Sequence, residues 1–167
     1  AYSLVHKHHG KSQNTLLVNP FSNDEYTASR GSGAALNGRR IRCTPTKSLS
    51  EAIVSTNTLN QFSSHAANHV ISDFMTELSA NVHQVLVGGC DALDIAMVAA
   101  GQVDAAILTN VNPHEIEASL LLCQEAGVLS GTLSGGLFGS KEDKLIVANP
   151  KLFKALVQRL NGYQTKL

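Results

Sequence analysis

The chain has 167 residues, which is enough for one domain with its own hydrophobic core and too few for two large ones. Its 13 basic residues balance its 13 acidic residues, so no overall charge favours nucleic acid or an anionic membrane as a partner. No apolar run is long enough to span a bilayer, and the first residues have no signal-peptide pattern. The three cysteines are far apart and form no CxxC pair, which predicts neither disulfides nor a zinc site and favours a reducing, cytoplasmic setting.

Residues 1–46 have the pattern of an antiparallel strand layer. Short β-prone runs alternate with turn residues, and the dipeptide Asn37-Gly38 is typical of a two-residue β-hairpin. The four predicted strands are YSLVH (2–6), NTLLVN (14–19), EYTAS (25–29) and RRIRC (39–43). We therefore expect a meander in this part of the chain.

Residues 47–167 alternate strand and helix. Asn112-Pro113 and Asn149-Pro150 each predict a helix start, because Asn can cap the first N–H groups and Pro fits the first helical position. The predicted strands are EAIVST (51–56), HQVLV (83–87), DAAILT (104–109) and DKLIVAN (143–149), and helices are predicted over 62–80, 92–101, the residues after Asn112, and 150–160. The fold class is therefore α/β: an antiparallel meander followed by a mixed α/β unit, together one compact domain.

A glycine pair joins one of these strands to a helix. Such a turn offers free N–H groups and the positive end of a helix dipole to an anion, so Gly88, Gly89 and Cys90 are candidate phosphate contacts. Asp91 would oppose an anion there, by roughly 1 to 4 kcal/mol at about 4 Å, although it would stabilise the helix as an N-cap. A tight turn that binds nothing is the alternative interpretation.

Two other groups of polar residues favour a structural reading. His6, His8 and His9 flank a predicted hairpin turn without acidic or Cys partners nearby in sequence, which indicates a solvated turn more than a metal site. The basic residues Arg30, Arg39, Arg40 and Arg42 lack interleaved aromatic side chains that could stack on bases. Nucleic acid is therefore an unlikely partner.

The helix after Asn112 begins with two acidic residues, Glu115 and Glu117. In a first turn, carboxylates suit the positive end of the helix dipole. The same position can also aim a carboxylate at a metal ion or a substrate. On the residues alone, both the structural and the functional reading stay open.

Three blocks of the sequence resemble the inositol monophosphatase family of metal-dependent phosphatases, and most closely its bacterial members. NPFSNDEYTASRGSGAALNG (19–38) is similar to the family signature P…DELYTA…G.GA.LNG. GGCDALDIAMVAAGQVDAAI (88–107) is similar to GSAALDLAYVAAGRLDG, and HEIEASLLLCQEAG (114–127) stands where the family has WDxAAGxLLVxEAGG. The spacing of the three blocks agrees as well.

The resemblance implies a layered α/β/α/β/α phosphatase fold, two or three Mg²⁺ ions, and hydrolysis of a phosphomonoester by metal-activated water. It also implies departures from the family pattern. The acidic DPxDGT loop and its partner Glu would precede residue 1, and the WD metal position is His114-Glu115. Cys90 and Asp91 replace small residues near the phosphate, and Leu108 replaces an acid that contacts inositol hydroxyls in many members.

These departures favour a member of the family with a degenerate active site, kept as a non-catalytic binding or assembly module without a cofactor. Self-association, as a homodimer, is what the resemblance implies for its assembly, and a protein partner in transcription is known for some bacterial relatives. The alternative is an enzyme: the C-terminal portion of a Mg²⁺-dependent phosphomonoesterase, completed by a segment upstream, with Glu115 as a metal ligand. The residue Ala1, which opens directly into a predicted strand, favours that alternative.

Overall fold

The computed structural model describes residues 1–61, 68–139 and 141–167 and contains two five-stranded sheets. The first sheet holds its strands in chain order, each antiparallel to the next, and so confirms the predicted meander. Its strands are β1 (Tyr2–His8), β2 (Lys11–Asn19), β3 (Asp24–Ser29), β4 (Gly33–Leu36) and β5 (Arg39–Arg40).

One strand of the meander was missed and one was placed too long. The strand β4 has the sequence GAAL, and the predicted strand 39–43 is confined to Arg39–Arg40. The predicted hairpin at Asn37-Gly38 is confirmed, because both residues adopt the positive φ angles, 50° and 75°, that a type I′ turn needs. This turn joins β4 to β5.

The second sheet is mixed, with the strand order β7-β6-β8-β10-β9. Its strands are β6 (Ile53–Thr56), β7 (Gln84–Val87), β8 (Ala105–Leu108), β9 (Leu129–Gly131) and β10 (Leu145–Ala148). The strand β6 runs parallel to β7 and β8, whereas β10 is antiparallel to β8 and β9. The strand β9 was not predicted.

Within the described residues, four α-helices accompany this sheet: α1 (Asn68–Ser79), α2 (Asp91–Ala99), α3 (Pro113–Ala126) and α4 (Pro150–Leu160). Short 3₁₀ helices cover Leu49–Glu51, Thr58–Gln61 and Asn161–Tyr163. The first residues of the helix predicted from residue 62, 62–67, lie outside the described residues. None of the described helices combines the length and the apolar character needed to cross a bilayer.

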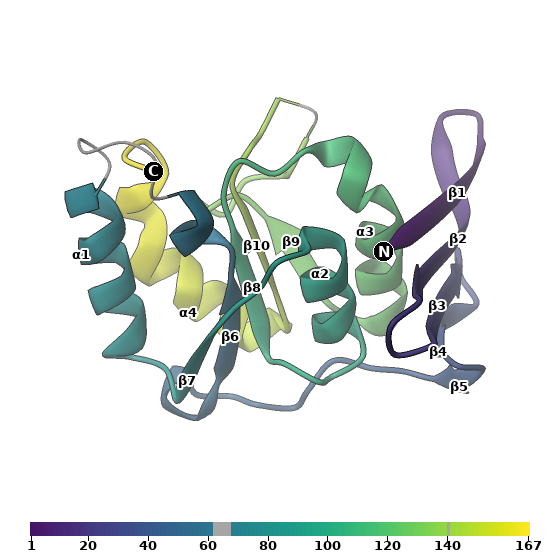
Figure 1. Ribbon diagram of the computed structural model, residues 1–167, viewed down its shortest axis with the longest axis horizontal. Coiled ribbons are helices and arrows are strands. Elements are labelled where there is room, and N and C mark those ends of the chain that lie inside the picture. Colours follow the sequence, from purple (N-terminus) through teal and green to yellow (C-terminus); the bar gives the residue numbers. More distant parts are fainter. Residues whose placement is uncertain (62–67, 140) are drawn as a thin grey trace.

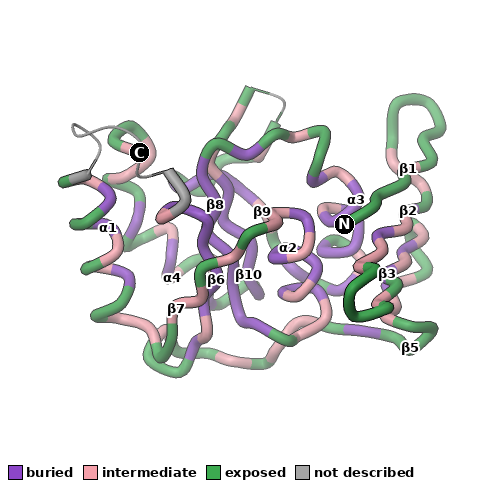
Figure 2. The backbone as a smooth tube through the Cα atoms, viewed as in Figure 1, coloured by how far each residue is buried: buried purple, intermediate pink, exposed green. Residues whose placement is uncertain are grey.

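The elements stack in four layers (Figure 1). The meander packs on α2 and α3, these two helices pack on one face of the mixed sheet, and α1 and α4 cover its other face. The central strands β8 and β10 are buried on both faces, whereas β1, at the outer edge of the meander, is mostly exposed (Figure 2).

Alternation along the central strands divides the core into two clusters. Ala106 and Leu108 of β8 point to the α2–α3 side, whereas Ala105 and Ile107 point to the α1–α4 side. The strand β10 alternates in the same way. Each strand of the sheet centre therefore contributes to both halves of the core, which explains its continuous apolar sequence.

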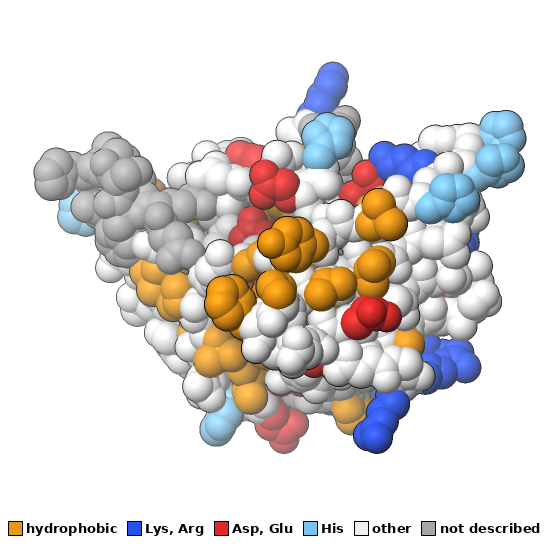
Figure 3. Space-filling view, turned by 45° about the vertical axis from the view of Figure 1, so that its right-hand side comes forward, with side chains coloured by type: hydrophobic (Ala, Val, Ile, Leu, Met, Phe, Trp, Pro, Cys, Tyr) orange, Lys and Arg blue, Asp and Glu red, His pale blue; other side chains and the backbone are white. Residues whose placement is uncertain are grey.

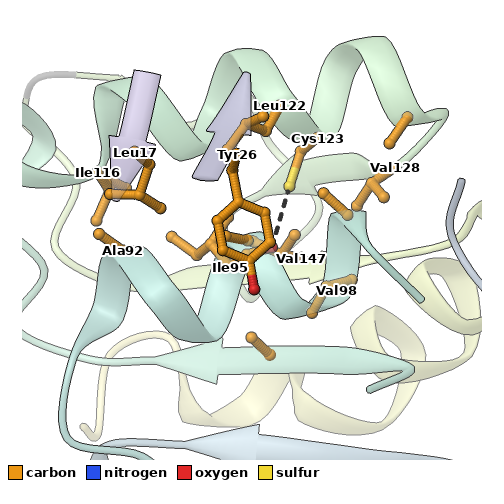
Figure 4. Close-up of a cluster of buried hydrophobic side chains, with 14 of the residues drawn as sticks. Leu17, Tyr26, Ala92, Ile95, Val98, Ile116, Leu122, Cys123, Val128 and Val147 are labelled. Carbon is orange, nitrogen blue, oxygen red and sulfur yellow. Dashed lines mark hydrogen bonds between the residues drawn. The ribbon is translucent and has the colours of Figure 1, made fainter. Parts of the chain in front are cut away.

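Half of the fourteen residues of helix α3 are buried, because the helix lies between the two sheets. Figure 4 shows Leu17 and Tyr26 of the meander meeting Leu122 and Cys123 of α3, with residues of α2 beneath them. Buried polar groups of α3 bond to the backbone of α2: the Ser119 hydroxyl donates to the Ala92 carbonyl at 2.7 Å. This satisfies a hydroxyl that would otherwise be costly to bury.

A matched pair of leucine substitutions tests this packing. Leu122 is fully buried between the sheets, so Leu122→Ala should lower the free energy of unfolding by about 2–5 kcal/mol through lost contacts and a cavity. Leu137 is 94% exposed, and Leu137→Ala should change it by less than about 0.5 kcal/mol. Urea denaturation of the two variants measures both values, and equal losses would contradict the four-layer packing.

Candidate functional site

A pocket of about 460 Å³ lies where the N-termini of α2 and α3 meet the first residues of the chain. Four of the predicted site residues, Gly89, Cys90, Asp91 and Glu115, line it together. The remaining wall is formed by Ala1, Ser3, Leu17 and Ala92. In Figure 1 the N-terminus lies beside α3. The glycine turn and the acidic helix start are therefore parts of one site, although Glu115 follows Asp91 by 24 positions in sequence.

Gly88, the fifth predicted residue, faces away from this pocket. A Cβ atom at this position would collide with both carboxylate oxygens of Asp94. The Gly88 N–H donates to the Thr56 carbonyl at 3.0 Å, which continues the pairing of β7 with β6. Gly88 therefore permits a close contact inside the fold, whereas Gly89 has open space where its Cβ would be and borders the pocket.

The helix α2 is capped by Cys90 and not by Asp91, which corrects the expected N-cap. Cys90 has extended backbone angles, and its carbonyl accepts the N–H groups of Leu93 and Asp94 at 2.9 and 3.0 Å. Its thiol makes no capping hydrogen bond. Asp91 is the first residue of the helix, where a carboxylate still suits the helix dipole.

Asn57 holds the Asp91 carboxylate and was not recognised from the sequence. Its side-chain N–H₂ donates to Asp91 Oδ1 at 2.9 Å and to the Thr109 carbonyl at 3.0 Å, and its Oδ1 accepts the Thr109 N–H at 2.9 Å. Asn57 is buried at the end of β6 and so links β6, the end of β8 and α2. This one amide fixes both the loop after β8 and the carboxylate in the pocket.

The two carboxylates of the pocket influence each other. Burial raises the pKa of Asp91, the hydrogen bond from Asn57 lowers it, and the nearby Glu115 carboxylate raises it again, leaving the pKa above its ordinary value. Two like charges at a half-buried site disfavour an anion and favour a ligand that offers hydrogen-bond donors or positive charge.

Glu115 also has a structural partner. The Asn112 side chain accepts the His114 N–H at 3.1 Å and donates to Glu115 Oε1 at 3.0 Å, while the Glu115 N–H donates to the Asn112 carbonyl at 3.0 Å. The predicted Asn-Pro helix start is therefore confirmed, and Glu115 takes part in the cap while lining the pocket.

Glu117 belongs to neither the cap nor the pocket. It lies beyond the first turn of α3, where only Glu115 is acidic. Its carboxylate pairs with Lys7 Nζ at 2.7 Å and accepts the Ser12 hydroxyl at 2.7 Å, so it ties α3 to the β1–β2 hairpin. The first-turn placement of Glu117 was therefore wrong, and its role is in tertiary packing.

Asp94 is a buried acid behind the glycine turn. It is 6% exposed, and its Oδ2 has no hydrogen-bond partner within the described residues. Burial raises the pKa of Asp94 to about 6, against a hydrogen bond with Ser55 that lowers it and with the Asp91 charge raising it further. The side chain occupies the space that Gly88 leaves empty.

The other predicted polar groups lie apart from the pocket. His6, His8 and His9 are on the β1–β2 hairpin, where His9 and Gly10 form the turn with positive φ. Arg30 and Arg42 bond to α3 residues across the layers, to Gln124 Oε1 and the Glu125 carbonyl. Leu108 is fully buried in the core. Figure 3 shows a face on which hydrophobic side chains gather near the middle, with acidic side chains beside them.

The described residues do not by themselves fit a magnesium site. Nowhere in residues 1–61, 68–139 and 141–167 do three His, Cys, Asp or Glu side chains come together as possible ligands of one metal ion. Mg²⁺ requires near-octahedral oxygen coordination, and Asp91 and Glu115 supply two carboxylates that are each engaged with an Asn amide. Among the described residues, the pocket therefore offers a ligand two carboxylates as acceptors.

The buried carboxyl of Asp94 generates a prediction about pH. Burial raises the pKa of Asp94 from 3.8 to about 6 in the folded state, so the folded protein holds this proton more tightly than the unfolded chain. The resulting contribution to the free energy of unfolding is fully present below about pH 4 and is lost as the pH rises through about 6. The raised pKa of Asp94 corresponds to on the order of 3 kcal/mol of unfolding free energy. In Asp94→Asn the decline in unfolding free energy between pH 4 and 7 should become shallower by that amount, as measured by urea denaturation at several pH values.

A control separates this effect from general charge. Asp73 is exposed on α1, and Asp73→Asn should keep the decline of the unsubstituted protein. Identical slopes for Asp94→Asn and the unsubstituted protein would show that Asp94 does not titrate in this range.

Comparisons with known proteins agree with the fold and the blocks around the pocket. The sequence profile of the inositol monophosphatase family matches residues 4–165. The Nus factor SuhB of Pseudomonas aeruginosa is 33% identical over 166 residues, which cover 98% of this chain and 60% of that protein. The chain thus spans about 60% of the length of this relative.

Solved structures show the same likeness. The extragenic suppressor protein SuhB of Bartonella henselae superimposes with a TM-score of 0.85 at 27% identity, covering 95% of this chain and 60% of that one. An IMPase/NADP phosphatase in complex with NADP and Ca²⁺ superimposes with a TM-score of 0.76 at 27% identity, covering 91% of this chain and 56% of that one. The predicted fold class is confirmed, and the chain belongs to the inositol monophosphatase family.

Proposed function

We propose that this chain is a family member with a degenerate site that serves as a binding or assembly module without catalysing phosphate release. The observation that supports this proposal most is the composition of the pocket: Asp91 and Glu115 line it, and no third His, Cys or acidic side chain of the described residues joins them in a metal-binding group. Hydrolysis in this fold, as the resemblance implies, needs metal-activated water. Two carboxylates held by Asn57 and Asn112 do not provide for it.

The two carboxylates of the pocket, Asp91 and Glu115, determine which ligands it suits. Cys90 and Asp91 border the glycine turn, and the Asp91 carboxylate faces Glu115, so a free phosphate meets two like charges without a metal to offset them. A ligand or partner group with hydroxyl or ammonium donors suits these acceptors better. Gly88 and Gly89 in this proposal shape the turn and do not grip a phosphate.

Assembly is the second part of the proposal. The relative from Pseudomonas aeruginosa is a Nus factor, which supports a protein partner in transcription for this chain. Self-association as a homodimer is proposed from the family resemblance. A reducing, cytoplasmic setting belongs to the same proposal, since Cys43, Cys90 and Cys123 are all free thiols.

A second candidate is the C-terminal portion of an active metal-dependent phosphomonoesterase. The similarity to a solved IMPase/NADP phosphatase with bound Ca²⁺ favours it, because this chain covers 56% of that protein. The position of Glu115 at the pocket also favours it. In this second candidate, Glu115 of the present chain adds one carboxylate to metal ligands that other segments supply.

Phosphate release from inositol monophosphate distinguishes the two candidates when the product of the complete open reading frame is assayed beside this chain, because the second candidate needs ligands from other segments. The chain should release no more phosphate than a buffer blank, whether Mg²⁺ is present, absent or accompanied by Li⁺, and Glu115→Gln should behave identically because no metal centre is lost. Colorimetric phosphate detection measures this. Release that depends on Mg²⁺ and disappears in Glu115→Gln would overturn the non-catalytic proposal and establish the enzyme.

A further inference from the structure

A second groove of the described residues lies away from the pocket of Asp91 and Glu115 and shares no lining residue with it. It measures about 500 Å³, within the roughly 300–1,000 Å³ typical of small-molecule sites. The second half of α3 forms one wall, the β9 edge forms another, and Ser12 and Arg30 of the meander close one end. None of the candidate phosphate contacts Gly88, Gly89, Cys90 and Asp91, nor Glu115, lines it.

Arg30 places a fixed positive charge in this groove. Its Nε donates to the Ser12 carbonyl at 2.8 Å, and its Nη1 donates to Gln124 Oε1 at 3.3 Å. Both acceptors are neutral, and no ion pair of Arg30 occurs among the described residues. A guanidinium has five donors, so the two bonds orient the group and leave donors for an incoming anion.

The acid that lines the same groove does not offset this charge. Glu117 is engaged with the Lys7 ammonium at 2.7 Å and with the Ser12 hydroxyl. These bonds more than compensate for burial, which alone would raise the pKa of Glu117, and they lower it below the ordinary value. Lys7 and Glu117 thus cancel each other. The nearby Glu125 carboxylate accepts the Gly31 and Gly33 N–H groups at 2.9 Å and does not line the groove, so the remaining charge among the lining residues is that of Arg30.

The other end of the groove is apolar. Leu121 and Val128 are buried in its floor, Leu120 is half-buried, and Leu129 on β9 is 45% exposed. A large apolar side chain left exposed beside a concave surface gains from cover by an apolar ligand. Charge and apolar surface therefore lie side by side in one concavity.

We propose that this groove is a second binding site, for a small amphipathic monocarboxylate whose carboxylate pairs with Arg30 and whose hydrocarbon part covers Leu120 and Leu129. A bidentate pair between the Arg30 guanidinium and the carboxylate fixes the orientation of the ligand. Leu120 and Leu129 favour a ligand with a hydrocarbon chain. The site is independent of the proposed function of the Asp91–Glu115 pocket.

Titration of the ¹⁵N-labelled chain with hexanoate tests the proposal by NMR. Hexanoate should shift the backbone amides of residues 117–130 in a saturable manner, and 1-hexanol and inorganic phosphate should each bind at least about fivefold more weakly, because each lacks one half of the recognition. Arg30→Gln should weaken the binding of hexanoate about tenfold. Arg39 is an exposed arginine of the same sheet, and Arg39→Gln should leave hexanoate binding unchanged. Leu129→Thr should weaken the binding of hexanoate without changing the binding of inorganic phosphate.

Several results would overturn the proposal. They are the absence of saturable shifts, shifts confined to other parts of the chain, phosphate or hexanol binding as tightly as hexanoate, and equal losses in Arg30→Gln and Arg39→Gln. If Arg30→Gln fails to fold, the ligand series and Leu129→Thr on the intact arginine still decide the question. Phosphate release from inositol monophosphate does not bear on this site, so the two proposals can fail separately.

Discussion

The structure depends on helices α2 and α3 being covered on both sides. The meander lies against one side of this helix pair and the mixed sheet against the other, so six of the nine residues of α2 and seven of the fourteen residues of α3 are buried. Each fully buried leucine or isoleucine in this layer contributes roughly 1.5–3 kcal/mol of transfer free energy. The small residues of α2, such as Ala92, Ala96 and Ala99, let α3 approach closely enough for Ser119 to bond the Ala92 carbonyl.

The same layer creates the pocket. Because α2 and α3 both begin at one edge of the helix layer, their first turns and positive dipole ends converge on a shared space. The acidic first-turn residues Asp91 and Glu115 each suit the dipole of their own helix, and both line the same pocket. Each carboxylate is favourable for its own helix, but the two negative charges repel each other in the pocket. The side-chain amides of Asn57 and Asn112 donate hydrogen bonds to Asp91 and Glu115 and so offset part of this repulsion.

Most of the fold could be predicted because its signals are local. The alternation of β2 and β3, the Asn-Pro helix starts and the Asn37-Gly38 turn each depend on neighbouring residues. The strands β4 and β9 escaped notice because GAAL and LSG contain no β-branched residue, and only their neighbours in the sheets make them strands. The lone Asn57 escaped notice for a related reason, since its partners Asp91 and Thr109 lie 34 and 52 residues away.

The site was predicted in part. Gly89, Cys90 and Asp91 were predicted as phosphate contacts and Glu115 as a metal ligand, and the four residues line one pocket. Their roles as ligands stay predictions. The separate duties of Gly88 and Glu117 could not be foreseen, because each is set by a contact across the fold, with Asp94 and with Lys7. Residues whose role is set by distant partners are therefore the ones that sequence patterns leave unassigned.

The contact of Gly88 with Asp94 restricts how this region can diverge. Any side chain at position 88 needs the volume that the Asp94 carboxylate fills, and a smaller residue at position 94 alone would leave a void behind the turn. Single substitutions at either place are thus disfavoured, whereas an exchange of bulk between them preserves the total volume. Descendants of this sequence should alter the two positions jointly or retain both.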